Sequence, residues 1–556
     1  MKASEMTLQS LLGGPNQYII PVFQRYYSWG KENWLGLWED LVELQEIGQP
    51  DSRHFMGALV FLAEPITPGQ LPVFQVIDGQ QRTITLVLLL CALRDVAHTR
   101  GFGLAAEITN TVLVHTFKRD REHFRVYPRQ RDRDQFTAAI EQQKVAEGNI
   151  QKALQFFTKE ISALKDCATE AELSGFFNLI VARLDFVAIT LQGNENPYRI
   201  FRSLNSTGVD LSEADLIRNF VFMHVPASEQ DRFDDQRWNL LEQHFFNADG
   251  RLNGVMMSAF FRDFMMSAGK YIPPTSTFQE FENYYAHGFQ PSDLLNELDL
   301  YAGFYDMIRG VKPHPDEDCQ VALSQLRQLE SSTTYPLILN LMLRVHQMTL
   351  STKDLAHAVK LIASFIFRRF VCGETSRPYG RWFVTACTQL GADPLAELRG
   401  VLKVRGFPSD TLFTDRFLQA DLYTSRYAKA VLEALERGKG NKDTTVDLTK
   451  ATVEHIMPQT LTDDWRAMLG PNAEQIHATW LHTLGNLTLT GYNSEFSNHS
   501  FDEKKEENER YPGYRQSNIQ LTREIANHTN WTETEIKLRG QALVREAVSI
   551  WIGPDA

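Results

Sequence analysis

The sequence predicts a multidomain α+β protein. A chain of 556 residues is too long for a single hydrophobic core, so about two to four domains are expected. Residues 1–220 mix short strand and helix patterns, whereas residues 221–420 show mainly helical periodicity. Residues 421–556 carry a compact group of polar motifs. These changes of pattern predict three domains with those boundaries.

The N-terminal region has the clearest individual elements. The β-branched and aromatic runs 57–62, 72–77 and 186–191 predict strands. Apolar residues cover most of the circumference of 83–96, which predicts a buried helix. Ser212 and Asp215 have the spacing of a capping box, so a helix is expected to begin there.

The remaining regions differ from the first in their periodicity. Residues 337–343 and 355–370 predict helices of the middle domain, and 313–315 predicts a loop. Residues 444–453 alternate weakly, as a strand does. The charged run 502–510 is expected to form a solvated helix face.

The composition is that of an ordinary globular protein, with 43% apolar and 22% charged residues. The longest apolar run, 86–93, is too short to span a bilayer, and the first ten residues lack the layout of a signal peptide. The five cysteines are scattered, which is typical of reduced thiols in a cytoplasmic protein. We therefore expect a cytoplasmic protein without a membrane partner.

The net charge of −13 argues weakly against binding to nucleic acid. Residues 118–133 nevertheless hold seven lysines and arginines and three acidic residues, with Phe124 and Tyr127 among them. This segment is equally consistent with a solvated surface and with a local patch for a polyanion. The overall charge therefore does not decide the partner.

Four polar residues near the C-terminus suggest a metal-dependent cleavage of phosphodiesters. Glu454 and His455 are followed by Asn486 and Asn493. A histidine with a near-neutral pKa can deprotonate water, and a divalent ion with oxygen ligands can carry the charge of a phosphate. Neighbouring strand residues point to opposite faces, so Glu454 and His455 share one site only if the strand ends there, which Pro458 favours. A buried structural histidine beside a surface glutamate, with the asparagines in turns, is the alternative.

The run Asp78-Gly79-Gln80-Gln81-Arg82-Thr83 joins a predicted strand to a predicted helix. Glycine permits a tight turn, the first amides of a helix bind anions, and the fork of Arg82 suits a phosphate. The sequence therefore predicts a phosphate-binding turn, although such junctions also occur as plain structural turns. No P-loop motif is present, so any NTPase activity would be of another kind.

Aromatic residues precede this turn. Tyr26, Tyr27, Trp29 and Trp34 could stack on a base or line a pocket for a modified DNA group. An aromatic core under the first long helix is an equally good explanation for Trp34 and Trp38.

The C-terminal motifs carry a family resemblance. Residues 454–459, 484–489, Asn493 and the Phe501-x-x-Lys504 spacing resemble the HNH (ββα-metal) nuclease domain of GmrSD-type, or Type IV, modification-dependent restriction enzymes. The resemblance implies that His455 is the general base, that Glu454 and Asn493 hold Mg²⁺ or Mn²⁺, and that Asn486 braces the catalytic loop. It also implies that Lys504 contacts a DNA phosphate. Many HNH sites have Asp in place of Glu454, and no cysteine follows Cys387, so no structural zinc knuckle is expected.

The N-terminal motifs carry a matching resemblance. Residues 21–29, 76–83 and 200–212 resemble the ParB/sulfiredoxin-like α/β nucleotidase domain of the same group, which includes the phosphorothioate-sensing SspE and the BREX-associated BrxU. The resemblance implies that Asp78 and Arg82 act in the hydrolysis of GTP or ATP. The residues implied in nucleotide binding are Arg25, Asp78, Gly79, Gln80, Gln81, Arg82 and Thr83, and those implied in DNA contact are Gln24, Tyr26, Tyr27 and Trp29.

The sequence thus favours a modification-dependent DNA endonuclease or nickase of antiphage defence, regulated by NTP binding and hydrolysis. Its expected substrate is double-stranded DNA with a base or backbone modification, and a homo-oligomer is compatible with the sequence. The alternatives are a nucleotide-dependent DNA-binding regulator with an inactive HNH domain, a defence scaffold, and an RNA-cleaving variant of the nuclease.

Overall fold

The computed structural model describes most of the chain: residues 2–22, 24, 26–47, 49, 52–65, 69–128, 132–164, 168–191, 212–226, 229–248, 250, 252–286, 288–439 and 446–556. Arg25 and residues 200–211 of the third N-terminal motif lie outside these residues. The fold is mixed α/β, mainly helical, with small sheets. Two compact units result: Met1–Ser258 with Phe278–Asn296, and Ala259–Thr277 with Glu297–Ala556. The predicted three-domain boundaries stay a prediction.

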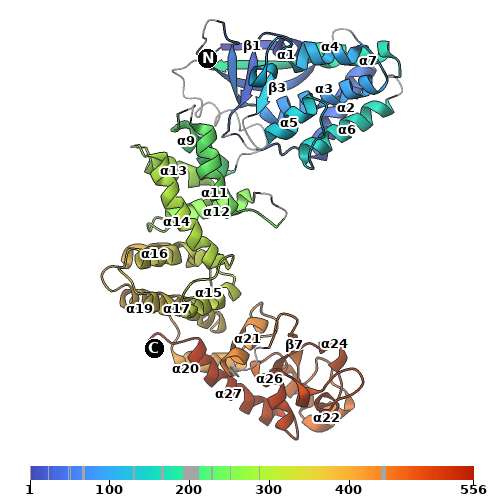
Figure 1. Cartoon of the computed structure of the whole chain (residues 1–556). Helices are drawn as coiled ribbons and strands as arrows, with labels where there is room; N and C mark the ends of the chain where they lie inside the picture. Colours follow the sequence, from blue (N-terminus) through green and yellow to red (C-terminus); the bar gives the residue numbers. More distant parts are fainter. Residues whose placement is uncertain are drawn as a thin grey trace. The chain divides into compact units, whose positions relative to one another are not determined.

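The described strands of the first unit form one mixed sheet with the order β1-β6-β3-β4-β2-β5 (Figure 1). Strand β3 pairs parallel with β6 and antiparallel with β4, whereas β2 pairs parallel with both β4 and β5. The bounds are β1 (Lys2–Thr7), β2 (Gln17–Ile20), β3 (His54–Ala63), β4 (Val73–Asp78), β5 (Val126–Pro128) and β6 (Leu184–Leu191).

Helices account for much of the described chain between residues 8 and 309, and those after residue 254 lie partly in the second unit. They are α1 (Leu8–Leu12), α2 (Lys31–Ile47), α3 (Gln80–Thr99), α4 (Leu104–Ile108), η1 (Thr109–Leu113), η2 (Asp120–His123), α5 (Asp132–Ile140), α6 (Asn149–Ala163), α7 (Glu170–Arg183), α9 (Glu213–Met223), α10 (Gln230–Phe233), η5 (Asp234–Trp238), α11 (Asn239–Gln243), α12 (Gly254–Met266), η6 (Pro274–Ser276), α13 (Thr277–Tyr284) and α14 (Pro291–Arg309).

Helix α3 is the centre of the first core. Its leucine-rich middle is buried on every side, as the lack of a polar stripe in the sequence predicts. The predicted strands at 57–62, 72–77 and 186–191 are confirmed as parts of β3, β4 and β6. Ser212 caps α9 together with Asp215, which confirms the capping box.

The second unit is helical before its short strand pair. Its elements are α15 (Glu317–Gln328), η7 (Ser332–Thr334), α16 (Tyr335–His346), α17 (Thr352–Val371), α18 (Tyr379–Gln389), α19 (Pro394–Val404), α20 (Asp410–Gln419), α21 (Ala428–Lys439), β7 (Thr452–His455), α22 (Asp463–Leu469), α23 (Ala473–Trp480), η8 (Leu484–Asn486), β8 (Leu487–Thr490), α24 (Asn493–Phe496), α25 (Phe501–Lys505), η9 (Tyr514–Gln516), α26 (Gln520–Arg523), η10 (Glu524–Asn527) and α27 (Glu533–Ile550). The predicted helices 337–343 and 355–370 are confirmed within α16 and α17.

Strands β7 and β8 form an antiparallel pair in which His455 lies opposite Leu487 and Glu454 lies opposite Thr488. A separate apolar cluster, which includes Trp465, Tyr514 and Trp531, packs beside this pair. The end of β7 therefore pairs with β8 and continues directly into the apolar cluster through Ile456 and Met457, so the side chains there are held by close packing.

Two local predictions in this region are wrong. The strand predicted for 444–453 begins only at Thr452, because residues 446–451 form turns and irregular backbone. The run 502–510 is not a solvated helix face, because α25 ends at Lys505 and the lysines at 504 and 505 are both buried. The run of charges gave a wrong prediction because Lys504 pairs with Glu454, 50 residues earlier, and Lys505 contacts the carbonyl of His528 as well as the nearby Asp502.

None of the helices in the described part of the chain has both the length and the apolar content needed to cross a membrane.

Candidate functional site

His455 is the last residue of β7 and is 5% exposed. Its Nε2 lies 3.1 Å from Nδ1 of His482, and its Nδ1 lies 3.4 Å from the side-chain nitrogen of Gln459. The ring of Tyr423 packs on it with centroids 4.1 Å apart. Both imidazole nitrogens thus have partners, so the orientation of the ring is fixed.

Burial lowers the pKa of His455 to about 3, and the neighbouring His482, Lys504 and His477 act in the same direction, while Asp421 opposes them. The ring is therefore neutral at neutral pH, as a proton acceptor must be. A base with such a low pKa is weak. An anionic phosphate beside it would raise the pKa, because negative charge favours the imidazolium form.

Glu454 points away from His455, as the alternation of a strand requires. Its Oε1 accepts a hydrogen bond from Lys504 Nζ at 2.6 Å and one from the Tyr514 hydroxyl at 3.3 Å. The side chains of Glu454 and Lys504 are 3% and 0% exposed. Burial raises the pKa of Glu454, and the ammonium of Lys504 opposes that shift.

Lys504 uses its ammonium group entirely within the protein. Besides Glu454, Nζ donates to the carbonyl oxygens of His455 at 2.9 Å and of Ile456 at 3.3 Å. It therefore holds the chain on both sides of the His455 ring. This role differs from the phosphate contact predicted for Lys504, which would require the side chain to leave three acceptors.

Asn486 is fully buried, and its amide is saturated with hydrogen bonds. Its oxygen accepts from the Met457 backbone at 2.8 Å and from Trp531 Nε1 at 3.1 Å. Its nitrogen donates to the carbonyls of Met457 and Leu481, each at 3.0 Å. Asn486 therefore ties the start of β8 to the turn after His455, which is the geometry of a brace and leaves no group free for a substrate.

Asn493 begins α24 and is half-buried. Its side-chain nitrogen donates to the carbonyl oxygen of Val453 at 2.9 Å, one residue before Glu454. Its amide oxygen makes no hydrogen bond within the described part of the chain. Asn493 thus offers an oxygen next to β7 that could ligate a hard cation.

The histidine partner of His455 is absent from the sequence-based site. His482 follows α23 and stacks with Tyr423, with ring planes 11° apart. His477, on α23, contacts the carbonyl of Pro458 at 2.9 Å. The signal that could have identified them is the presence of three histidines within 28 residues, two of them just before the Leu-Gly-Asn run.

The N-terminal site is built on the junction of β4 and α3, as predicted. Gly79 has a φ of +91°, and a Cβ there would lie 2.2 Å from a methyl of Leu59, so only glycine fits this turn. The helix that follows begins with three backbone N–H groups that no carbonyl within the helix can satisfy. Such an end attracts anions.

Arg82 and Asp78 form the accessible part of this junction, with side chains 22% and 20% exposed and a distance of 3.6 Å between Nη2 and Oδ2. Nη1 of Arg82 donates to the Met56 carbonyl at 2.7 Å. Gly57 has a φ of +94°, and a Cβ there would lie 2.2 Å from the same Nη1. The guanidinium of Arg82 therefore contacts the backbone of β3 through Nη1, and its Nη2 lies beside Asp78.

Gln81 and Gln24 form hydrogen bonds that hold the segment before α2 against the β4–α3 junction. Gln81 accepts from the backbone of Ser28 at 2.8 Å and donates to the carbonyl of Tyr26 at 3.1 Å. Gln24 donates to the carbonyl of Ile77 at 2.7 Å. The Thr83 hydroxyl donates to the Gly79 carbonyl at 3.1 Å, and Gln80 is buried.

The aromatic residues divide into core and loop. Tyr27 is buried, and its hydroxyl pairs with Thr85 and with Trp34 Nε1, each at 2.8 Å. Trp34 and Trp38 belong to the same core, which confirms the core explanation for both. Tyr26 and Trp29 are half-buried, and the Tyr26 hydroxyl donates to Glu242 at 3.2 Å. A DNA contact by Tyr27 would require it to leave the core.

Two family models match the chain. Residues 8–222 match the model described as GmrSD restriction endonuclease, N-terminal domain, and residues 407–546 match the model described as GmrSD restriction endonucleases, C-terminal domain. The first range contains the Asp78–Arg82 junction, and the second contains the His455 cluster. No curated protein matches the chain.

Proposed function

Because the chain belongs to the GmrSD family of restriction endonucleases, it is a DNA endonuclease of defence, and we propose that it cleaves the phosphodiester at the His455 cluster in response to DNA modification and NTP. The observation that carries the proposal is the environment of His455. A neutral, oriented imidazole ends β7, and Asn486 braces the turn that follows it.

In the proposed reaction Gln459 gives up its 3.4 Å contact with Nδ1 of His455, and this nitrogen takes a proton from water as the water oxygen attacks phosphorus and the bond to the leaving oxygen breaks. His482 contacts Nε2 of the His455 ring at 3.1 Å, and we assign it as a positioning residue. Tyr423 covers both rings and limits access of bulk solvent. These contacts fix the direction from which a water must approach.

The proposed cofactor is Mg²⁺ or Mn²⁺, and the residues fit it in part. Asn493 offers an amide oxygen, whereas the carboxylate of Glu454 is held by Lys504. Both hydrogen bonds to Glu454 end on Oε1, so Oε2 could serve as a ligand, although the ammonium of Lys504 would repel a cation beside it. A bound divalent ion would stabilise the charge on the phosphate and on the leaving oxygen.

We further propose that the β4–α3 junction binds the phosphates of GTP or ATP. The helix end and Arg82 supply positive potential, and Asp78 is placed to orient Arg82 or a water. Gln81 links α3 to residues 26–29, the segment predicted to contact DNA. Nucleotide at the junction and modified DNA at this segment would therefore act on one hydrogen-bonded network.

A cleavage assay on matched plasmids tests the function. The substrates are unmodified, hydroxymethylated, glucosylated and phosphorothioated DNA, each with Mg²⁺ or Mn²⁺ and with or without GTP or ATP. We expect one modified plasmid to be nicked or cut in an NTP-dependent manner, and EDTA to stop cleavage. Equal cleavage of all substrates would refute modification dependence.

One observation favours the alternative of a DNA-binding regulator with an inactive nuclease. The carboxylate of Glu454 forms a buried ion pair with Lys504. This alternative predicts nucleotide-dependent DNA binding without cleavage of any plasmid. The same panel, read by gel shift as well as by cleavage, separates the two functions.

Arg82→Ala is expected to reduce NTP hydrolysis by about 100-fold or more, because a preorganised donor at a phosphate contributes at least that much. Asp78→Ala is expected to reduce it as well, because Asp78 orients Arg82 or the attacking water. Phosphate release from GTP and ATP is the measurement. Arg53→Ala is the control. Arg53 also forms an ion pair with an aspartate, in which Nη1 lies 3.1 Å from Oδ1 of Asp185, but it is not part of the β4–α3 junction. Unchanged turnover in both junction variants would remove the nucleotide from this site.

A further inference from the structure

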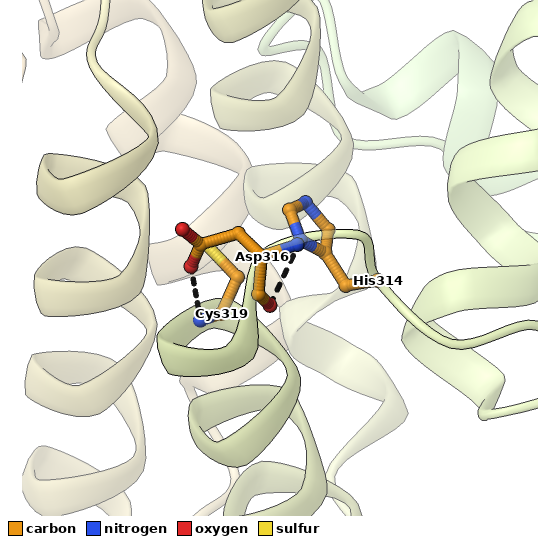
Figure 2. Close-up of side chains that lie close together, drawn as sticks. All are labelled: His314, Asp316 and Cys319. Atoms are coloured by element: carbon orange, nitrogen blue, oxygen red, sulfur yellow. Dashed lines mark hydrogen bonds between the residues drawn. The ribbon is translucent and has the colours of Figure 1, made fainter.

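Three metal-binding side chains meet at the start of α15, outside both sites described above. His314, Asp316 and Cys319 each offer one ligand atom, and these atoms all lie within 4.8 Å of one another (Figure 2). They occupy six consecutive positions, His-Pro-Asp-Glu-Asp-Cys. The second unit thus presents a nitrogen, an oxygen and a sulfur donor from one short turn.

Local hydrogen bonds fix this turn. Asp316 caps α15 by accepting from the Cys319 backbone at 2.9 Å, and Nδ1 of His314 lies 3.4 Å from the Asp316 carbonyl oxygen (Figure 2). The Asp316 backbone also donates to Nδ1 of His314 at 3.1 Å. The backbone of His314 donates to Gln320 at 2.8 Å. These bonds keep the donors close, but they would also form in a simple helix cap, so they do not identify a ligand.

A neighbouring pocket provides the independent observation. It has a volume of about 460 Å³, and its walls include His314, Asp316 and His346. His346 ends α16, a different element, and so brings a second imidazole to the pocket that the cap does not require. His314 and Asp316 line the pocket and Cys319 does not, so a cation at the turn would face the pocket on the side of its nitrogen and oxygen donors.

We propose that His314, Asp316 and Cys319 form a zinc site whose fourth position faces this pocket. A mixed set of imidazole, carboxylate and thiolate favours zinc over the hard ions expected at a nuclease site. Zinc bonds of about 2.0 to 2.3 Å bring ligand atoms closer together than 4.8 Å, so modest side-chain rotations are needed. The Cys319 thiol donates to the Thr352 carbonyl at 3.2 Å, so zinc binding would break this bond and release the thiol proton. The two anionic ligands that result would balance the charge of the ion.

Zinc content of the purified full chain tests the proposal. We expect about one zinc per chain after incubation with zinc and removal of the excess, measured by elemental analysis. Cobalt in its place should give the visible absorption of a tetrahedral ion and a thiolate-to-metal band. His314→Ala and Cys319→Ser should each lose the bound zinc and the thiolate band.

Asp316→Asn separates the metal from the helix cap. Asparagine caps a helix as well as aspartate does, so the variant should fold normally while its zinc affinity falls by about 10-fold or more. Asp393→Asn is the matched control, because Asp393 caps α19 in the same way at 3.1 Å, and Cys387→Ser controls for loss of a buried thiol. Absence of zinc from the parent protein, or its retention in the three site variants, would overturn the proposal.

Discussion

His455→Ala is expected to lower DNA cleavage by about 10²- to 10⁴-fold, the usual contribution of a positioned general base. The physical reason is that the described side chains near the ring offer no equivalent neutral imidazole aimed in the same direction. His482 is held by the stacking of its ring on Tyr423 and by its carbonyl, which accepts from the Leu422 backbone at 3.0 Å. Nicking of a modified plasmid with Mg²⁺ or Mn²⁺ is the measurement.

Controls distinguish loss of chemistry from loss of structure. Circular dichroism and thermal melting should show that the His455→Ala protein is folded. His499→Ala removes another half-buried histidine, whose ring contacts Tyr511 at 2.9 Å, and should leave cleavage intact. His482→Ala should lower cleavage by less than His455→Ala does. Parental cleavage by a folded His455→Ala protein would show that the base lies elsewhere.

The sequence predicts best where a motif and its partners are close together. The β4–α3 junction was predictable, because the strand, the glycine and the helix are consecutive and each has a local physical signature. The bracing role implied for Asn486 agrees with its geometry, since its partners lie within or just before the same motif pair apart from Trp531. Local pattern is sufficient for such elements.

Partners that are distant in sequence were not predictable. His482 is 27 residues from His455, and Tyr423 reaches the same ring from before β7. Tyr27 is predicted from the sequence to contact DNA, but it is buried and its hydroxyl pairs with Thr85 of α3, 58 residues away. Periodicity shows that a residue is buried only when its neighbours share the pattern, and Tyr27 lies in an irregular segment.

Lys504 gives the sharpest contrast between sequence and structure. It stands in a run of charges that predicts exposure, yet its side chain is fully buried on Glu454, 50 residues away. Breaking a buried ion pair by removing one partner costs about 3–5 kcal/mol, because the other charge is left without compensation. Lys504→Met is therefore expected to destabilise the C-terminal part of the chain by about that amount, as measured by urea unfolding.

The exposed pair Glu533–Lys537 is the matched control. Its atoms are 2.7 Å apart, but the side chains are 41% and 44% exposed, so Lys537→Met should cost only about 0–1 kcal/mol. An unchanged unfolding midpoint in Lys504→Met would show that the buried pair does not hold β7 in place.

The double variant Glu454→Leu with Lys504→Met decides what Glu454 does. Replacing both charges by apolar groups of similar size should restore most of the lost stability. If Glu454 serves only to hold β7 beneath His455, the stable double variant should also regain cleavage. If Glu454 is a metal ligand that Lys504 releases on DNA binding, stability should return while cleavage does not, and the requirement for Mg²⁺ or Mn²⁺ in Glu454→Gln should rise. We expect partial recovery of cleavage in the double variant. Lys504 also donates to the carbonyls of His455 and Ile456, which orients the segment that carries the base, and Lys504→Met removes these two bonds.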